Sequence, residues 1–343
     1  MNKKFIRCLD GWRGYAVFLV LIYHLLGQFA GSEIYHLLAT YISPLGRKGV
    51  QIFFVISGYL IIGNIVNEIS HHHFFSIRNF FVKRFFRILP PYYFYLAVCL
   101  LVSLFRKDLV HPAEILRGVF FLTYIPIEKT LIYTAHMWSL CLEEYFYLII
   151  SILFLFNAKN SKHLTKIILF VLFILLSQGA VTILKIKSGF IYDLLEFRFM
   201  FMGGLIAILN KKYADKINWE KLVVARPIFL AFFTLLLFYT PPGYMLIFPV
   251  IIGITIHLTT INPTRFISIV FENRPISWLG TISYSVYLWN SFFIPWSEYY
   301  IFKSKINLIQ QFPLNIGFSL ALAVFSYKYI EQPMIRYGRK FLK

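Results

Sequence analysis

Long stretches with few or no charges recur along the whole chain, and they constrain its fold more than any other feature. Runs of about 17 to 22 apolar residues are long enough for a helix to cross the hydrocarbon core of a membrane. The composition agrees, since 59% of the residues are hydrophobic and 14% are charged, whereas soluble domains average about 25% charged. A water-soluble domain is therefore excluded, and continuous rather than alternating runs argue against a membrane β-barrel. The sequence predicts an all-α polytopic membrane protein.

The hydrophobic runs predict about ten transmembrane helices, at residues 12–28, 48–66, 88–105, 136–156, 164–184, 191–209, 226–240, 244–260, 280–301 and 309–329. A shorter apolar piece, residues 115–125, is bracketed by prolines and interrupted by Arg117, so we expect an interfacial or re-entrant segment there. The other connections are mostly short. We therefore expect a single transmembrane domain over residues 1–343, with no separate soluble domain.

The formal charge of +19 is explained by membrane topology. If the N-terminus is cytoplasmic, about 22 Lys and Arg residues lie on the cytoplasmic side and about 10 on the other, as the positive-inside rule requires. Both termini are then expected in the cytoplasm, with an uncleaved first helix. Because Lys and Arg residues in the cytoplasmic loops account for the excess of positive charge, no nucleic-acid partner is expected.

No metal site is expected from the cysteines and histidines. Cys8, Cys99 and Cys141 stand singly in or beside apolar segments, without the paired spacing of metal ligands or disulfides. The run His71–His73 could bind a metal, but we find no matching acidic or cysteine partner for it and expect a solvated loop.

Ionisable side chains at membrane depth mark the candidate site, because a charge in lipid is costly and is usually functional. On the first helix, Arg13 and His24 are eleven residues apart, so they share one face and lie about 16 Å apart along the axis. Asp10 lies at the same cytoplasmic end as Arg13. A single intramembrane histidine can also be a helix-to-helix contact, so the case for His24 depends on its neighbours.

Two further helices carry polar groups to the expected depth of His24. Counted from the outer ends of their helices, Ser57 lies roughly 13 Å deep, and Glu143 and Glu144 lie roughly 10 Å deep. A base, a hydroxyl and an acid in one layer are the parts of a nucleophilic or acid–base site. Adjacent helix residues point about 100° apart, so we expect only one glutamate to face His24.

Polar residues at the outer helix ends allow two interpretations. Glu196 and Arg198 are either a structural pair or an acceptor contact. His136 and Trp138 are either interfacial anchors or part of the acceptor entrance. Asn290 is a weaker candidate for the same outer, acceptor-binding region.

Basic residues gather near the cytoplasmic end of the third helix, where Arg84 and Arg87 are i, i+3 neighbours and can hold a phosphate group between them. Ordinary positive-inside charge would explain these two residues alone. The spacing from Arg13 to His24, however, approximates the reach of an extended pantetheine arm. An acyl-CoA held by its phosphates at this cationic mouth could therefore present its thioester to His24.

Six segments in this order resemble the membrane acyltransferase family 3: LDGWRGYAVFLVLIYH, GVQIFFVISGYLI, KRFFRILPPYY, HMWSLCLEEYFYL, ISYSVYLWN and YIEQP. The resemblance runs from Leu9 to about Pro333. It implies a ten-helix domain of the bacterial inner membrane that takes an acyl group, usually acetyl, from cytoplasmic acyl-CoA. The implied acceptor is a hydroxyl of lipopolysaccharide, exopolysaccharide, peptidoglycan or a related glycoconjugate, or of a lipid-linked sugar, and no cofactor is expected to be permanently bound.

The resemblance also assigns residues. The family's Arg and His with ten residues between them fall on Arg13 and His24, its Arg-x-x-Arg on Arg84 and Arg87, and its Ser-Gly on Ser57 and Gly58. Its Trp-Ser-Leu with paired glutamates falls on Trp138, Ser139, Leu140, Glu143 and Glu144. The chain departs from the family at Gln51, Asn290 and Gln332, where the family commonly has Asp, His and Arg. It also stops soon after the last helix, without the extracytoplasmic hydrolase-like domain of longer relatives.

Two chemical routes and two rival classes follow from these residues. In the first route, the three arginines and Asp10 bind CoA, and His24, oriented by one of the paired glutamates, deprotonates a sugar hydroxyl that attacks the thioester. In the second route, the acyl group passes covalently through His24 or Ser57. A transporter or flippase of a lipid-linked glycan would instead line its path with the same charges. A purely structural membrane partner is the other alternative.

Overall fold

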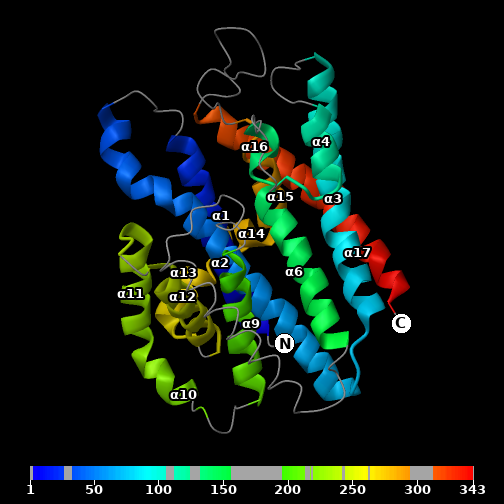
Figure 1. The fold of residues 1–343 in the computed structure, drawn as a ribbon. Coiled ribbons are helices and arrows are strands. Elements are labelled where there is room, and N and C mark those ends of the chain that lie inside the picture. The colour runs from blue at the N-terminus through cyan, green and yellow to red at the C-terminus, as the bar shows by residue number, and fades with distance from the viewer. Residues whose placement is uncertain are drawn as a thin grey trace. The chain divides into compact units, whose positions relative to one another are not determined.

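A computed structural model describes residues 3–26, 33–105, 112–123, 132–155, 195–212, 217, 219–241, 244–261, 263–293 and 312–342. Figure 1 shows these residues as helices with short connections. No strand occurs in these ranges, so the predicted all-α class is confirmed for them. The span expected at 164–184 lies outside the described residues.

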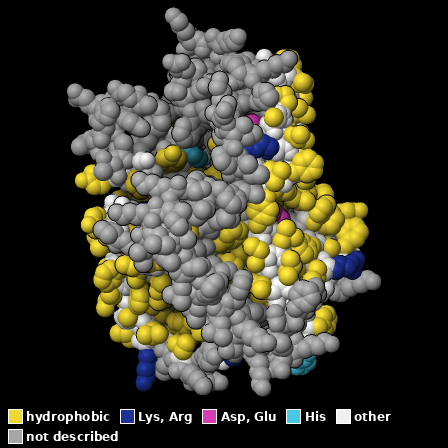
Figure 2. All heavy atoms as spheres, in the orientation of Figure 1, with side chains coloured by type: hydrophobic (Ala, Val, Ile, Leu, Met, Phe, Trp, Pro, Cys, Tyr) yellow, Lys and Arg dark blue, Asp and Glu magenta, His cyan; other side chains and the backbone are white. Residues whose placement is uncertain are grey.

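Among the described helices, four are long and apolar enough to cross a membrane: Tyr41–His72, Ile77–Phe105, Tyr133–Phe154 and Tyr244–Ile261. Large apolar side chains also face outward, such as Leu104 at 65% and Phe105 at 85% exposure. Figure 2 shows hydrophobic side chains over most of the described surface on the face drawn, with few charges. A surface of this kind suits lipid better than water, so the chain is a membrane protein with several apolar helices. The full number of spans and their orientation stay predictions.

The helices group into two compact units. The first comprises residues Met1–Leu19, Arg47–Phe75 and Tyr145–Thr281, and the second comprises Val20–Gly46, Ser76–Glu144 and Ile282–Lys343. Helices α1 (Lys3–Leu26), α2 (Glu33–His72) and α6 (Trp138–Leu155) continue from one unit into the other.

The first unit is held together by close backbone contacts at glycines. It contains α9 (Phe197–Lys212), α10 (Trp219–Leu222), α11 (Arg226–Phe238), α12 (Tyr244–Ile261), α13 (Arg265–Phe271) and α14 (Arg274–Thr281), with parts of α1, α2 and α6. A Cβ at Gly58 would lie 1.8 Å from the Met200 carbonyl oxygen, and one at Gly203 would lie 2.0 Å from that of Val55. Helices α2 and α9 therefore approach too closely for any larger residue at these positions. The indole of Trp12 adds a hydrogen bond to Thr259 Oγ1 at 2.9 Å.

The second unit contains α3 (Ile77–Phe105), α4 (Pro112–Val119), α5 (Ile132–Ala135), α15 (Ser283–Trp289), α16 (Leu314–Ser326) and α17 (Gln332–Gly338), with parts of α1, α2 and α6. A π-helical segment, Tyr327–Glu331, joins α16 to α17. The phenol of Tyr92 on α3 donates to the carbonyl of Gly118 on α4 at 2.7 Å, and Arg117 pairs with Glu114 at 2.8 Å. The segment expected at 115–125 is thus a short helix fixed against α3 in its described part.

Helix limits differ from the predicted ones where polar residues or backbone breaks occur. Helix α2 begins at Glu33, not at 48, and the added part carries Arg47, whose Nε pairs with Glu196 Oε1 at 2.9 Å. The single span expected at 280–301 is wrong in its described part, since the helix is interrupted at Ile282, whose φ of −96° and ψ of 6° are not helical. Hydropathy measures apolar content and carries no information on backbone continuity.

Candidate functional site

His24 on α1 lies in the second unit and is buried, with 7% of its surface exposed. The side chain of Asn290, which is fully buried directly after α15, forms a hydrogen bond with this imidazole. A second imidazole, that of His136, lies within electrostatic range of His24. The second unit therefore places two buried histidines and an amide together, and these three residues are termed the two-histidine cluster.

The backbone of His136 is fixed by two hydroxyl groups. His136 lies in the turn between α5 and α6, and its carbonyl accepts hydrogen bonds from Tyr287 Oη at 2.8 Å and from Ser139 Oγ at 3.3 Å. The two hydroxyls are 2.6 Å apart. The rings of Tyr95 and Tyr287 lie edge-on to the imidazole, with centroids 5.6 and 5.5 Å away. This packing leaves the His136 ring little freedom to move.

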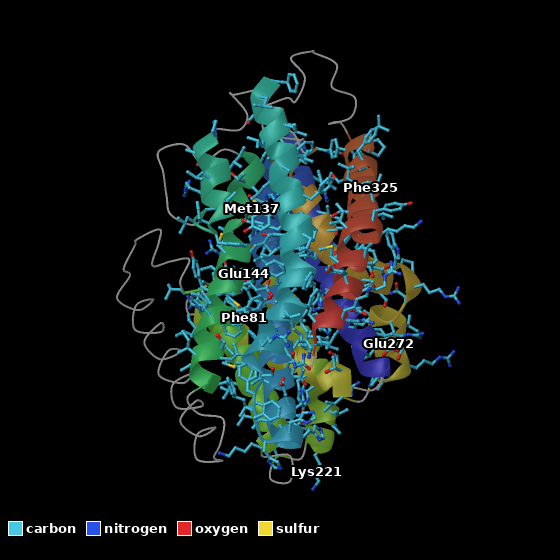
Figure 3. All side chains as sticks on the ribbon, turned by 90° about the vertical axis from the view of Figure 1, so that its right-hand side faces the viewer. Phe81, Met137, Glu144, Lys221, Glu272 and Phe325 are labelled. Carbon is cyan, nitrogen blue, oxygen red and sulfur yellow. The ribbon has the colours of Figure 1, made fainter. Side chains whose placement is uncertain are left out.

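The paired glutamates lie near the start of α6, where Figure 3 labels Met137 and Glu144 about two turns apart along the chain. Glu144 lies within electrostatic range of Arg84, which is on α3. Glu143 lies within electrostatic range of Tyr287. Both carboxylates also lie within electrostatic range of Tyr284, so they share part of their surroundings. An orienting role of either one toward His24 stays a prediction.

The arginines expected to bind phosphate fall in both units. Arg13 pairs with Asp10 at 3.6 Å on α1 in the first unit, and both side chains are about one-fifth exposed. In the second unit, Arg84 donates to the Phe80 carbonyl at 3.1 Å and stacks over the Phe80 ring, while Arg87 is exposed. Arg84 is therefore held in place on its own helix, whereas Arg87 is open to solvent. The convergence of the three arginines on one ligand stays a prediction.

Ser57 lies on α2 in the first unit and is half-buried. It directly precedes Gly58, whose backbone contacts α9. The predicted meeting of Ser57 with His24 joins residues of different units and stays a prediction.

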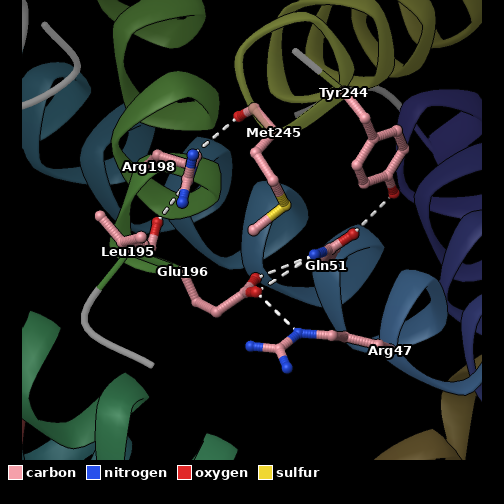
Figure 4. Close-up of polar contacts among 7 residues, drawn as sticks. All are labelled: Arg47, Gln51, Leu195, Glu196, Arg198, Tyr244 and Met245. Atoms are coloured by element: carbon pink, nitrogen blue, oxygen red, sulfur yellow. Dashed lines mark hydrogen bonds and ion pairs between the residues drawn. The ribbon is translucent and has the colours of Figure 1, made fainter. Parts of the chain in front are cut away.

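Glu196 is the centre of a buried polar network in the first unit (Figure 4). Its carboxylate, fully buried, pairs with Arg47 Nε at 2.9 Å and accepts hydrogen bonds from Gln51 Nε2 at 3.1 and 3.2 Å. Tyr244 Oη donates to Gln51 Oε1 at 3.0 Å. Arg198 donates to the backbone carbonyls of Leu195 and Met245 at 2.6 and 3.0 Å. Glu196 and Arg198, which the sequence suggests as a structural pair, thus also bind other residues.

Sequence reasoning did not single out several of these partners. Tyr287 lies inside a segment quoted for the family resemblance, and Ser139 was assigned only through that resemblance, because neither side chain carries a charge. Arg47 was counted only as an outer loop charge, because its partner Glu196 is 149 residues away in sequence. Trp138, expected at the acceptor entrance, is the first residue of α6 and is half-buried.

Comparison with known proteins gives these residues a context. The chain is 27% identical to the peptidoglycan O-acetyltransferase OatA of Listeria monocytogenes, over 98% of this chain and 57% of that protein. It is 25% identical to the O-acetyltransferase OatA of Staphylococcus aureus, over 99% of this chain and 58% of that protein. The chain therefore spans less than three-fifths of the length of these relatives. No solved structure matches it.

The sequence profile of acyltransferase family 3, described as an acyltransferase domain, matches residues 6–328. This match covers nearly the whole chain, including α1 with His24, both glutamates and Asn290. The resemblance seen in the six sequence segments is thereby confirmed, and the chain belongs to acyltransferase family 3.

Proposed function

We propose that this protein is a membrane O-acetyltransferase that moves an acetyl group from cytoplasmic acetyl-CoA to a hydroxyl of a cell-wall glycan. The observation that carries the proposal is the two-histidine cluster, in which a buried imidazole on α1 is held by an amide beside a second imidazole. The family match supports acyl transfer, and the names of the relatives support peptidoglycan as the acceptor. An O-antigen, an exopolysaccharide or a lipid-linked sugar is the alternative acceptor.

On the donor side, Arg13, Arg84 and Arg87 bind the phosphates of CoA, with Asp10 orienting Arg13. The exposure of Arg87 and the ion pair of Arg13 with Asp10 support this role. Guanidinium groups suit phosphate because each offers several donors in a fixed plane. The pantetheine arm then extends toward His24, about 16 Å along α1.

In the chemical step, His24 accepts the proton of the acceptor hydroxyl while the hydroxyl oxygen attacks the thioester carbonyl. The carbon–sulfur bond breaks, the ester forms, and the proton passes from His24 to the departing CoA thiolate. A neutral imidazole can do this near neutral pH, where a sugar hydroxyl alone cannot ionise. The hydrogen bond with Asn290 orients the ring, and Glu143 or Glu144 stabilises the charge that His24 gains. Transfer through an acylated His24 or Ser57 is the second route to the same product.

On the acceptor side, Trp138, Glu196, Arg198 and Asn290 were expected to contact the sugar. Trp138 suits this role, because an indole stacks on the apolar face of a sugar ring. The partners of Glu196 and Arg198 support a role in holding α2, α9 and α12 together in the first unit. The contact of Asn290 with His24 gives it a positioning role in addition.

A test uses the purified protein in proteoliposomes with radioactive acetyl-CoA and solubilised peptidoglycan strands. The wild type is expected to transfer label to the glycan, and His24→Ala to lose roughly 100- to 10,000-fold in rate, the usual contribution of a general base. His71→Ala, which changes an exposed histidine at the end of α2, is the matched control and should keep wild-type activity.

In cells that carry His24→Ala, a glycan that is normal in amount but has lost its acetyl groups would support acyl transfer. Loss of the glycan itself would contradict it and favour a transporter. Protein-bound label that accumulates without an acceptor would support the covalent route.

A further inference from the structure

His136 is a second buried imidazole within electrostatic range of His24, and the proposed mechanism assigns it no role. It is 7% exposed, and its ring is enclosed by the rings of Tyr95 and Tyr287. The Leu288 carbonyl approaches the ring, but neither ring nitrogen has a well-formed hydrogen bond to any residue in the part of the chain that the structure describes. A buried polar group without a partner is destabilising, so a ligand that hydrogen-bonds to this ring would satisfy it.

The way in which His136 is held also indicates a binding role. Tyr287 and Ser139 bind its backbone carbonyl, not its ring, so they fix its place and leave the ring nitrogens available. Helix α6 begins two residues later, at its expected extracytoplasmic end. An acceptor that arrives from outside would therefore reach His136 and His24 from the same side.

Resting on the proposed function, we propose that His136 binds the acceptor sugar through a hydrogen bond between its ring and a polar group next to the hydroxyl that His24 deprotonates. A neutral imidazole offers one donor and one acceptor, and a sugar carries hydroxyl or amide groups that match either. Two imidazoles within electrostatic range of each other then favour a sugar that carries a second polar group near the reacting hydroxyl. His136 would thus be a substrate-binding residue that aligns the nucleophile and takes no proton itself.

The experiment compares His136→Phe and His136→Gln with the wild type in proteoliposomes, with acetyl-CoA and solubilised peptidoglycan strands as substrates. His257→Phe is the matched control, because His257 is also fully buried and has one ring nitrogen without a partner among the described residues, but it lies in the first unit. We expect His136→Phe to raise the KM for the glycan roughly 5- to 30-fold, as for one lost buried hydrogen bond. The KM for acetyl-CoA should stay unchanged, and His136→Gln should recover part of the loss.

An active wild type with an unchanged glycan KM in His136→Phe, or an equal rise in His257→Phe, would overturn the role of His136 alone. A wild type that transfers no acetyl group from acetyl-CoA would overturn the proposed function itself. The two failures are therefore distinguishable.

A second measurement needs no variant and covers the case in which His136→Phe does not fold. Diethyl pyrocarbonate acylates accessible imidazole nitrogens, and peptide mass spectrometry locates the product. We expect the glycan strands to protect His136 at least 3-fold, while the exposed His71–His73 react equally in both samples. Equal labelling of His136 with and without glycan, or no labelling in either sample, would contradict the proposal.

Discussion

The imidazole of His24 forms a hydrogen bond with an amide, that of Asn290, and not with a carboxylate. A carboxylate would stabilise the charged imidazolium strongly, whereas Asn290 can orient the ring without favouring its protonation to the same degree. The amide is itself fixed, since Asn290 Nδ2 donates to the Tyr287 carbonyl and Ser291 Oγ donates to Asn290 Oδ1 at 3.3 Å. The orientation of His24 therefore depends on the backbone just after α15.

Asn290→Ala should lower kcat roughly 10- to 100-fold, the usual cost of losing a residue that orients a functional histidine. The KM for acetyl-CoA should change little, because Asn290 is not expected to touch the donor. The matched control is Asn315→Ala, which removes another fully buried amide in the second unit, on α16. A kcat of Asn290→Ala within 3-fold of the wild type would show that the contact with His24 has no positioning role.

A second prediction at the residue scale concerns the buried Glu196. Arg47→Met should destabilise the protein by about 1–3 kcal/mol, because it removes the ionic partner of a fully buried carboxylate. The double variant Arg47→Met/Glu196→Gln should recover most of the loss, since a neutral amide in place of the carboxylate needs no ion pair. Thermal unfolding in detergent measures both effects. A double variant no more stable than Arg47→Met would show that the burial of the charge is not what costs stability.

At the scale of elements, the packing of α2 against α9 depends on glycines. Gly58→Ala should prevent the native approach, because its Cβ would meet the Met200 carbonyl oxygen at 1.8 Å and a backbone atom cannot move aside. Overpacking of this kind costs roughly 1–3 kcal/mol or more. Gly317→Ala on α16 is the control, since no atom lies within 4 Å of its added Cβ. Comparison of yield and unfolding temperature tests the pair, and equal values for both variants would refute the packing argument.

The sequence predicts that the helices exist, but it does not predict where each helix begins and ends. Apolar content identifies a helix from its interior, so α3 and α12 were found. It fails where polar residues continue a helix through contacts with distant residues. The part of α2 before residue 48, for example, carries Arg47, whose ionic partner Glu196 is 149 residues away in sequence. The break at Ile282 is a property of the backbone, which hydropathy cannot report.

The candidate site was predicted in part for a similar reason. A histidine or a glutamate in an apolar run is visible in the sequence, so His24, Glu143 and Glu144 were identified. The contact of His24 with Asn290 joins residues 266 positions apart, and only the fold brings them together. Tyr287 and Ser139 act through backbone contacts with His136, and no sequence pattern predicts which carbonyl a hydroxyl will bind.

At the scale of the whole molecule, the buried cysteines allow the predicted topology to be tested. Cys8, Cys99 and Cys141 have 0% exposure. Burial also raises the pKa of the Cys8 thiol, which precedes the first apolar run, to about 12. The thiolate is the reactive form, so near neutral pH this thiol stays protonated and unreactive. The wild-type protein should therefore give no signal with a membrane-impermeant maleimide.

Single cysteines introduced into this background then report the two sides of the membrane. His72→Cys lies at the exposed end of α2, where the cytoplasm is predicted, and Tyr239→Cys lies just after α11, where the outside is predicted. Intact cells should label Tyr239→Cys and not His72→Cys, and inverted membrane vesicles should show the reverse. The reversed pattern would place His136 on the cytoplasmic side. It would contradict the entry of the acceptor from outside, because His136 would then face the cytoplasm, where the acyl donor is and the glycan is not.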